Sequence, residues 1–150
     1  MRAVKDAVSV PVIVNGDIVD AVSARSALVK SGADAVMIGR GAYGRPWLAG
    51  QIDAALIGAD VVEPDLETRL DIALTHFDDA LAFYGERLGL KVFRKHLGWY
   101  VEAGPAPADP AARRQAKAQL CRLEQPHEVR AALKALWSAD NRSASDRLAA

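Results

Sequence analysis

Residues 11–47, PVIVNGDIVDAVSARSALVKSGADAVMIGRGAYGRPW, decide the fold of this chain. Two short apolar runs, residues 10–14 and 35–38, each end in a polar turn that contains glycine. Between them, residues 21–31 carry apolar side chains at helical spacing and are followed by Gly32. Strand, helix and strand in this order predict a unit with two parallel strands. Runs of Val and Ile without polar alternation are typical of strands covered on both faces.

The two turns, residues 15–17 and 39–41, follow the carboxyl ends of the predicted strands, where α/β folds place their ligands. Glycines in both turns allow backbone N–H groups to approach a ligand closely. Arg40 adds a guanidinium that can bind the same anion. A TIM barrel binds phosphate with the loops that follow its seventh and eighth strands. The pattern therefore predicts a phosphate site, with ordinary tight turns as the alternative.

These two segments resemble the closing part of the tRNA-dihydrouridine synthases, flavoenzymes that reduce uridine in tRNA. PVIVNGDI and GADAVMIGRGAYGRPWL carry the resemblance, and other FMN-binding barrels share only a looser version. The resemblance implies that the two units are strands seven and eight of an FMN-binding TIM barrel. It also implies five residues that contact FMN, chiefly at its phosphate and ribityl chain: Asn15, Gly16, Asp17, Gly39 and Arg40.

The length of the chain does not suit a whole barrel. A TIM barrel takes about 250 residues, whereas this chain has 150. We therefore expect an α/β C-terminal part of a larger enzyme, in which residues 1–60 form the last two βα units. The stretch GADVVEP ends this part, and we expect an all-α, tRNA-binding helical bundle over residues 61–138 and a flexible tail over 139–150. A two-stranded parallel sheet leaves both edges and much apolar surface exposed.

The bundle is predicted from four helical patterns with short connections. The first covers residues 66–88, with an apolar stripe that ends at one of two glycines, and the second covers residues 91–103. A stiff connector rich in proline and glycine precedes a third helix, residues 110–123, and a fourth runs over 126–137. Short connections between consecutive helices favour an antiparallel arrangement.

The zero net charge of the chain conceals two oppositely charged segments. Residues 63–86 contain seven acidic residues and one basic residue, whereas residues 87–122 contain eight basic and two acidic ones. Within the basic segment, Lys91, Arg94 and Lys95 fall at i, i+3 and i+4, on one helical face. This pattern suits a phosphate backbone, although a solvated charged face is the alternative.

The stretch RKHLGWY, residues 94–100, carries a second resemblance. It is similar to the RKH-x-x-WY stretch in the helical C-terminal domain of bacterial tRNA-dihydrouridine synthases, where that domain holds tRNA. The resemblance implies that Arg94, Lys95 and His96 face tRNA. Basic residues of the next helix would extend this surface: Arg113, Arg114 and Lys117. By residue type alone, a histidine such as His96 is more often a hydrogen-bonded core residue.

In the family that the chain resembles, reduced FMN passes a hydride to C6 of uracil, a cysteine on a barrel loop protonates C5, and NADPH restores the flavin. Cys121 lies between leucines in a C-terminal helix with no partner to lower its pKa, so we interpret it as a small buried hydrophobe. We therefore expect no catalytic residue here and no uridine reduction by this chain alone. No metal site is expected, because the histidines lack a second ligand at metal-binding spacing.

The composition, with 51% hydrophobic residues, is that of a globular protein. One cysteine excludes a disulfide framework, and no apolar run reaches the roughly 20 residues of a membrane span. No signal peptide is evident, so we expect a cytoplasmic protein without a membrane partner. Two alternatives stay open: the end of another FMN-dependent TIM-barrel oxidoreductase, which the basic helix argues against, and a non-catalytic RNA-binding remnant, which tight tRNA binding without flavin would favour.

Overall fold

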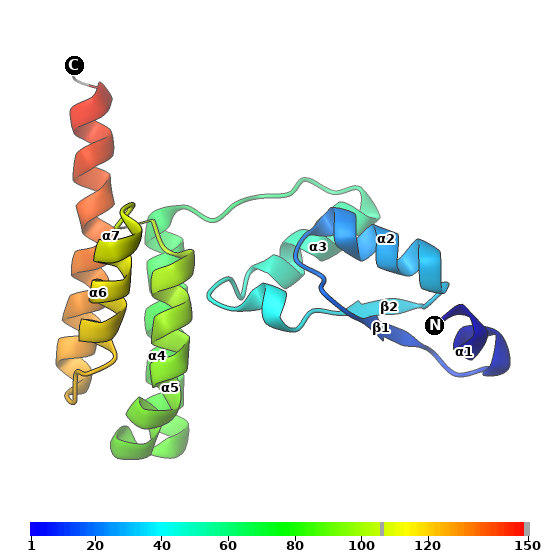
Figure 1. The fold of residues 1–150 in the computed structure, drawn as a ribbon, viewed down its shortest axis with the longest axis horizontal. Helices are drawn as coiled ribbons and strands as arrows, with labels where there is room; N and C mark the ends of the chain where they lie inside the picture. The colour runs from blue at the N-terminus through cyan, green and yellow to red at the C-terminus, as the bar shows by residue number, and fades with distance from the viewer. Residues whose placement is uncertain (106, 149–150) are drawn as a thin grey trace. The chain divides into compact units, whose positions relative to one another are not determined.

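The computed structural model describes the backbone of residues 1–105 and 107–148 and the side chains up to residue 137 (Figure 1). The chain divides into two compact units, Met1–Glu63 and Pro64–Ala150. The expected flexible tail lies outside the described side chains and stays a prediction. The elements follow in the order α1 (Arg2–Ala7), β1 (Ile13–Asn15), α2 (Ala21–Ser31), β2 (Ala35–Met37), the 3₁₀ turn η1 (Arg40–Ala42), α3 (Leu48–Ile57), α4 (Leu66–Tyr84), α5 (Glu86–Ala103), α6 (Pro110–Leu120) and α7 (Pro126–Leu148).

The first unit contains the predicted parallel strand pair. Strand β1 pairs with β2 in a register that sets Ile13 opposite Ala35, and α2 connects the two strands. Asp20 caps the start of helix α2, and its carboxylate accepts a hydrogen bond from the Ser23 N–H (2.7 Å). Gly32 caps the end of the helix in the left-handed conformation (φ +69°) that glycine tolerates best. Both ends of this helix are therefore encoded locally, and the end at Gly32 is the one that the sequence predicted.

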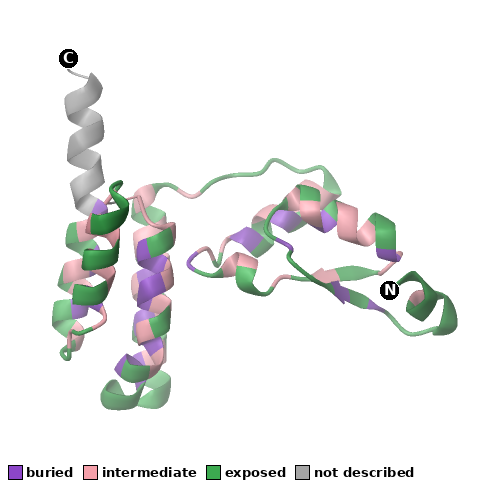
Figure 2. Ribbon diagram, in the orientation of Figure 1, coloured by how far each residue is buried: buried purple, intermediate pink, exposed green. Residues whose placement is uncertain are grey.

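The sheet of the first unit is covered on one face only. Helices α2 and α3 contribute to a small core with Ile18, Ala24 and Ile52, and Val14 is 6% exposed on the same side. On the opposite face, Ile13 is 60% exposed and Met37 is 51% exposed. Within the described residues the strands are therefore not covered on both faces, and apolar surface remains accessible, as expected for a sheet of two strands (Figure 2).

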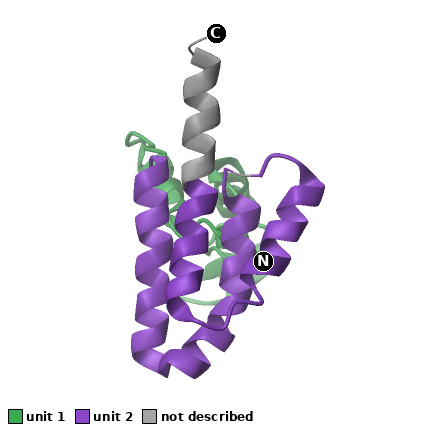
Figure 3. Cartoon of the chain, turned by 90° about the vertical axis from the view of Figure 1, so that its left-hand side faces the viewer, with its two compact units in different colours: residues 1–63 green, residues 64–150 purple. Residues whose placement is uncertain are grey.

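The second unit is the predicted helical bundle (Figure 3). Helix α4 packs against α5 and α7, and α6 packs against α5 and α7, so each helix has two neighbours. Their buried side chains form one continuous core whose large members are Phe77, Phe93, Leu97, Tyr100 and Trp137. This core, rather than the sheet, is the larger apolar cluster of the described chain.

Helix α5 differs from its predicted bounds, because it begins at Glu86 instead of residue 91. Only Gly85 links α4 to α5, with φ +77°, and Gly89 lies inside the helix. A Cβ atom added at Gly89 would lie 2.7 Å from the Ala80 carbonyl oxygen and 2.9 Å from Leu81 Cα. Gly89 therefore lets the two helices pack closely, whereas the sequence indicated a possible helix end.

Candidate functional site

The two glycine-bearing turns meet in one hollow of the first unit. This hollow has a volume of about 750 Å³ and is lined by residues 15–19 and 39–41. All five residues that the resemblance assigned to FMN line it. They come together because β1 and β2 are parallel neighbours, so that Asn15 and Met37 are paired at the ends of their strands.

Close packing of the two loops depends on Gly41, which was not among the predicted FMN contacts. A Cβ atom at this position would collide with the carbonyl oxygen of Ile18 and lie 3.1 Å from Val19 Cα. Gly16 and Gly39 differ, because among the described residues, chain neighbours aside, no heavy atom lies within 4 Å of an added Cβ at either position. Gly41 thus allows the two loops to pack in direct contact, whereas the backbone at Gly16 and Gly39 is open to a ligand.

Opposite charges face each other across the hollow. The Arg40 guanidinium donates a hydrogen bond to the Asp17 carboxylate (3.3 Å), and both side chains are almost fully exposed. Exposed pairs of this kind contribute little to stability, so the guanidinium remains available to an anion. Asp17 has φ +44°, a conformation uncommon outside glycine but tolerated by Asp. The loops therefore offer backbone donors and one cation beside one carboxylate acceptor.

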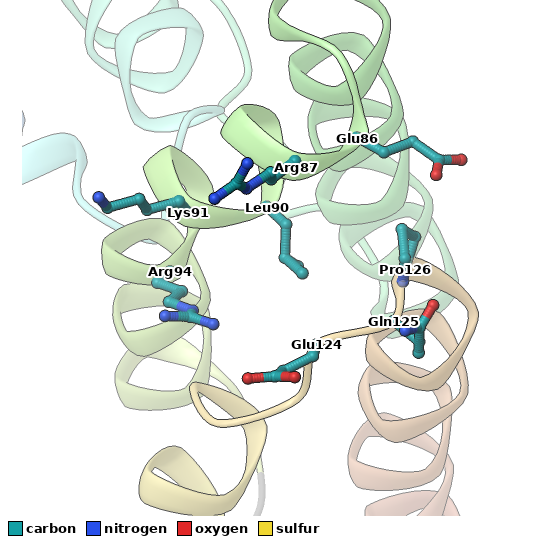
Figure 4. Close-up of a pocket in the computed structure, with 8 residues that line it drawn as sticks. All are labelled: Glu86, Arg87, Leu90, Lys91, Arg94, Glu124, Gln125 and Pro126. Atoms are coloured by element: carbon teal, nitrogen blue, oxygen red, sulfur yellow. The ribbon is translucent and has the colours of Figure 1, made fainter.

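The three residues predicted to face tRNA have three different surroundings on α5. Consecutive helical residues point about 100° apart, so Arg94, Lys95 and His96 cannot share one face. Arg94 lines a pocket between α5 and the segment joining α6 to α7 (Figure 4). Lys95 is exposed, with its Nζ 5.9 Å from the centre of the Trp99 ring. Arg94, Lys95 and His96 thus point in different directions from α5 and do not form one continuous surface patch.

His96 is half-buried in a cluster of rings. Its imidazole stacks on Phe93 at 5.3 Å and lies edge-on to His76 at 4.9 Å. Burial lowers the pKa of His96, and the nearby His76 and Lys95 lower that pKa further. Burial also lowers the pKa of His76, whose Nδ1 lies 3.0 Å from the Tyr100 hydroxyl. The lowered pKa values favour the neutral form of both imidazoles at pH 7, so His96 contributes a polar ring rather than a cation.

Arg113 corrects the expectation that the next helix extends the basic surface. Its guanidinium donates to the carbonyl oxygens of Val101 (3.0 Å), Glu102 (2.8 Å) and Gly104 (2.9 Å), at the end of α5. Lys117 pairs with the Glu102 carboxylate (3.0 Å). Both cations thus have partners within the bundle. Arg113 in particular satisfies helix-end carbonyls that would otherwise lack a donor.

Cys121 is a half-buried residue of the bundle, as expected from its apolar neighbours. Its thiol donates to the Arg94 carbonyl oxygen (3.4 Å), and burial raises its pKa. Among the described residues, no group of three or more His, Cys, Asp and Glu side chains could hold a metal ion. In that same part of the chain, every helix is too short or too polar to span a membrane.

Comparison with known proteins links these features to one family. The family model described as dihydrouridine synthase (Dus) matches residues 1–139. The chain is 53% identical over 121 residues to the probable tRNA-dihydrouridine synthase of Rhodobacter capsulatus, covering 75% of this chain and 37% of that protein. It is 45% identical to the probable tRNA-dihydrouridine synthase of Rhizobium leguminosarum, covering 89% and 39%. It is 44% identical to tRNA-dihydrouridine synthase B of Xanthomonas axonopodis, covering 71% and 32%. The chain thus spans about a third of the length of these relatives.

Proposed function

Because the chain belongs to the dihydrouridine synthase family, we propose that it takes part in the reduction of uridine to 5,6-dihydrouridine in tRNA. FMN is the proposed cofactor and NADPH the reductant. In this proposal the first unit holds the phosphate end of FMN, and the bundle holds tRNA. The observation that carries the proposal is the hollow in which two glycine-bearing loops meet at the ends of parallel strands.

The donor set of the hollow fits the phosphate and ribityl chain of FMN. Open backbone at Gly16 and Gly39 and the guanidinium of Arg40 suit a phosphate group. The carboxylate of Asp17 and the amide of Asn15 suit the hydroxyls of the ribityl chain. When bound, FMN supplies the redox chemistry, and these residues bind and orient it.

The exposed sheet face supports the proposal that the first unit is the last part of a TIM barrel. Ile13 and Met37 are more than half exposed on this face, whereas parallel strands are covered on both faces in such folds. Further strands would cover these side chains. In the family, the cysteine that protonates C5 of uracil lies on a barrel loop. Cys121 lies in the bundle instead, so we assign no catalytic residue to this chain.

The bundle supports the tRNA-binding part of the proposal through α5. Arg94 and Lys95 are cations without an ion pair in the described part of the chain. His96 adds a neutral ring beside them. Cations with neighbouring aromatic rings suit RNA, which presents phosphates and unstacked bases. We propose that these three residues contact tRNA.

Flavin binding tests the proposal directly. We expect FMN to bind the chain, as measured by quenching of flavin fluorescence. Arg40→Ala is expected to weaken FMN binding about tenfold, the value of one charge-assisted hydrogen bond. Riboflavin lacks the phosphate, so its weaker binding should be the same in the wild type and in Arg40→Ala.

Lys30→Ala is the matched control, because Lys30 is an exposed cation of α2 outside the hollow. Equal losses for FMN and riboflavin in Arg40→Ala would contradict a phosphate role for Arg40. Binding of tRNA without any binding of FMN would instead favour a non-catalytic RNA-binding module.

A further inference from the structure

A basic pocket of the bundle has no role in the function proposed so far, apart from Arg94. Its volume is about 500 Å³, and it lies between α5 and the segment that joins α6 to α7. Arg87, Lys91 and Arg94 line it from α5 at i, i+4 and i+7, so they share one face of that helix. The buried Leu90 forms an apolar part of its wall. Three cations thus line one concave surface.

Two carboxylates, Glu86 and Glu124, line the same pocket, but neither forms an ion pair with these cations in the described structure. Among the described residues, Arg87, Lys91 and Arg94 make no ion pair. The Nε of Arg94 is buried and has no hydrogen-bond partner in the part of the chain that the structure describes. A buried donor without an acceptor is unfavourable. An anion in the pocket would supply the missing acceptors and neutralise the charge.

The opposite wall is polar and includes a carboxylate. Figure 4 shows Glu124 on the connecting segment, facing Arg94 across the hollow, with Gln125 beside the start of α7. A pocket for a bare phosphate would gain nothing from Glu124, which repels an anion. Glu124 and Gln125 instead suit a ligand that carries hydroxyl or amino donors next to its phosphate. A nucleotide has both features.

Exposed aromatic rings adjoin the same cations. Phe83 is 82% exposed and Tyr84 is 46% exposed, and their rings are in edge-to-face contact at 4.8 Å. Tyr84 lines a neighbouring hollow together with Arg87 and Lys91. Exposed aromatic faces beside cations are typical of proteins that stack unpaired bases. The paired bases of a duplex present no free face for such stacking.

We propose that this pocket binds one unpaired nucleotide of an RNA. Arg87, Lys91 and Arg94 bind its phosphate, and Glu124 and Gln125 accept or donate hydrogen bonds at its ribose or base edge. This inference rests on the proposed RNA-binding role of the bundle and specifies the kind of RNA element that it takes. To the three residues that the resemblance assigned to tRNA it adds Arg87, Glu124 and Gln125, together with Lys91 from the basic face that the sequence indicated.

Binding of a fluorescein-labelled oligouridylate, followed by fluorescence anisotropy, tests the pocket. Glu124→Ala is expected to weaken binding by about tenfold, although it removes a negative charge. Glu124→Gln keeps a hydrogen-bonding oxygen and should lose less. The logarithm of the binding constant falls linearly with the logarithm of the salt concentration. Arg87→Ala should make this slope shallower by about 0.7, the value of one phosphate contact on a single strand.

Matched controls separate this inference from a general charge effect. Glu128 and Lys134 are exposed residues of α7 outside the pocket, so Glu128→Ala and Lys134→Ala should not weaken binding as the pocket variants do. Unchanged or tighter oligouridylate binding by Glu124→Ala, with tRNA still bound, would overturn the pocket alone. Failure of the wild type to bind either RNA would overturn the proposed tRNA role, and the pocket with it.

A competition experiment tests whether the site takes unpaired nucleotides. An oligouridylate–oligoadenylate duplex should compete poorly with the labelled oligouridylate, and equal competition would contradict a site for unpaired nucleotides.

Discussion

The guanidinium of Arg113 shows how a basic residue in a charged segment can serve the fold. It donates to the carbonyl oxygens of Val101, Glu102 and Gly104 at the end of α5, and to that of Pro107 in the connector (2.8 Å). Arg113→Ala leaves these partly buried acceptors without a donor. We expect a loss of about 2 kcal/mol in the free energy of unfolding, the range for hydrogen bonds to a charged group.

Urea denaturation followed by circular dichroism measures this loss, and Arg114 supplies the control. Arg114 is the exposed neighbour of Arg113, so Arg114→Ala should change stability by no more than about 0.5 kcal/mol. Similar losses in the two variants would show that Arg113 acts only through its charge.

Residue type and spacing could not distinguish Arg113 from a ligand-binding arginine. The sequence predicted the end of α2 at Gly32 because a glycine just after a helical pattern is a local stop signal, and the Asp20–Ser23 cap at its start is equally local. The sequence also predicted that two glycine-bearing turns follow the strand ends, and residues of both turns line the hollow. The partners of Arg113 depend instead on how the chain returns after α5, and a local pattern does not contain that information.

At the scale of the helices, Gly89 sets the distance between α4 and α5. A Cβ atom there would lie 2.7 Å from the Ala80 carbonyl oxygen, so Gly89→Ala forces the two backbones apart. Alanine normally stabilises a helix interior by about 1 kcal/mol relative to glycine. We expect the opposite sign for Gly89→Ala, with a loss of about 1–3 kcal/mol from overpacking, measured by denaturant unfolding.

Gly50 in α3 is the matched control, because no atom lies within 4 Å of an added Cβ at that position. Gly50→Ala should therefore stabilise its helix by up to about 1 kcal/mol. Stabilisation by both substitutions would show that the α4–α5 contact can relax. The sequence indicated Gly89 only as a possible helix end, since its reason lies in a neighbouring helix rather than in its own turn.

Across the whole molecule, the two units differ in how much apolar surface they bury. Among the described residues, the core cluster of the first unit has four buried members, whereas that of the second unit has twelve. Local stability follows buried apolar contact, so amide hydrogens of β1 and β2 should exchange faster than those of α4 and α5. Hydrogen exchange followed by mass spectrometry measures both units in one sample. Equal protection would contradict this difference, which agrees with the exposed apolar surface expected for a sheet of two strands.

Ligand linkage joins this difference to the proposed function. A ligand that binds only the folded state stabilises it by about 2.7 kcal/mol at a hundredfold excess over Kd. FMN should therefore slow exchange in peptides that contain the hollow of the first unit, whereas oligouridylate should slow exchange around residues 84–94 and 124–126. Arg40→Ala should abolish the first effect and leave the second. A bound ligand slows amide exchange most strongly around its own site. If FMN slowed exchange only in the bundle, that result would contradict FMN binding at the glycine-bearing loops.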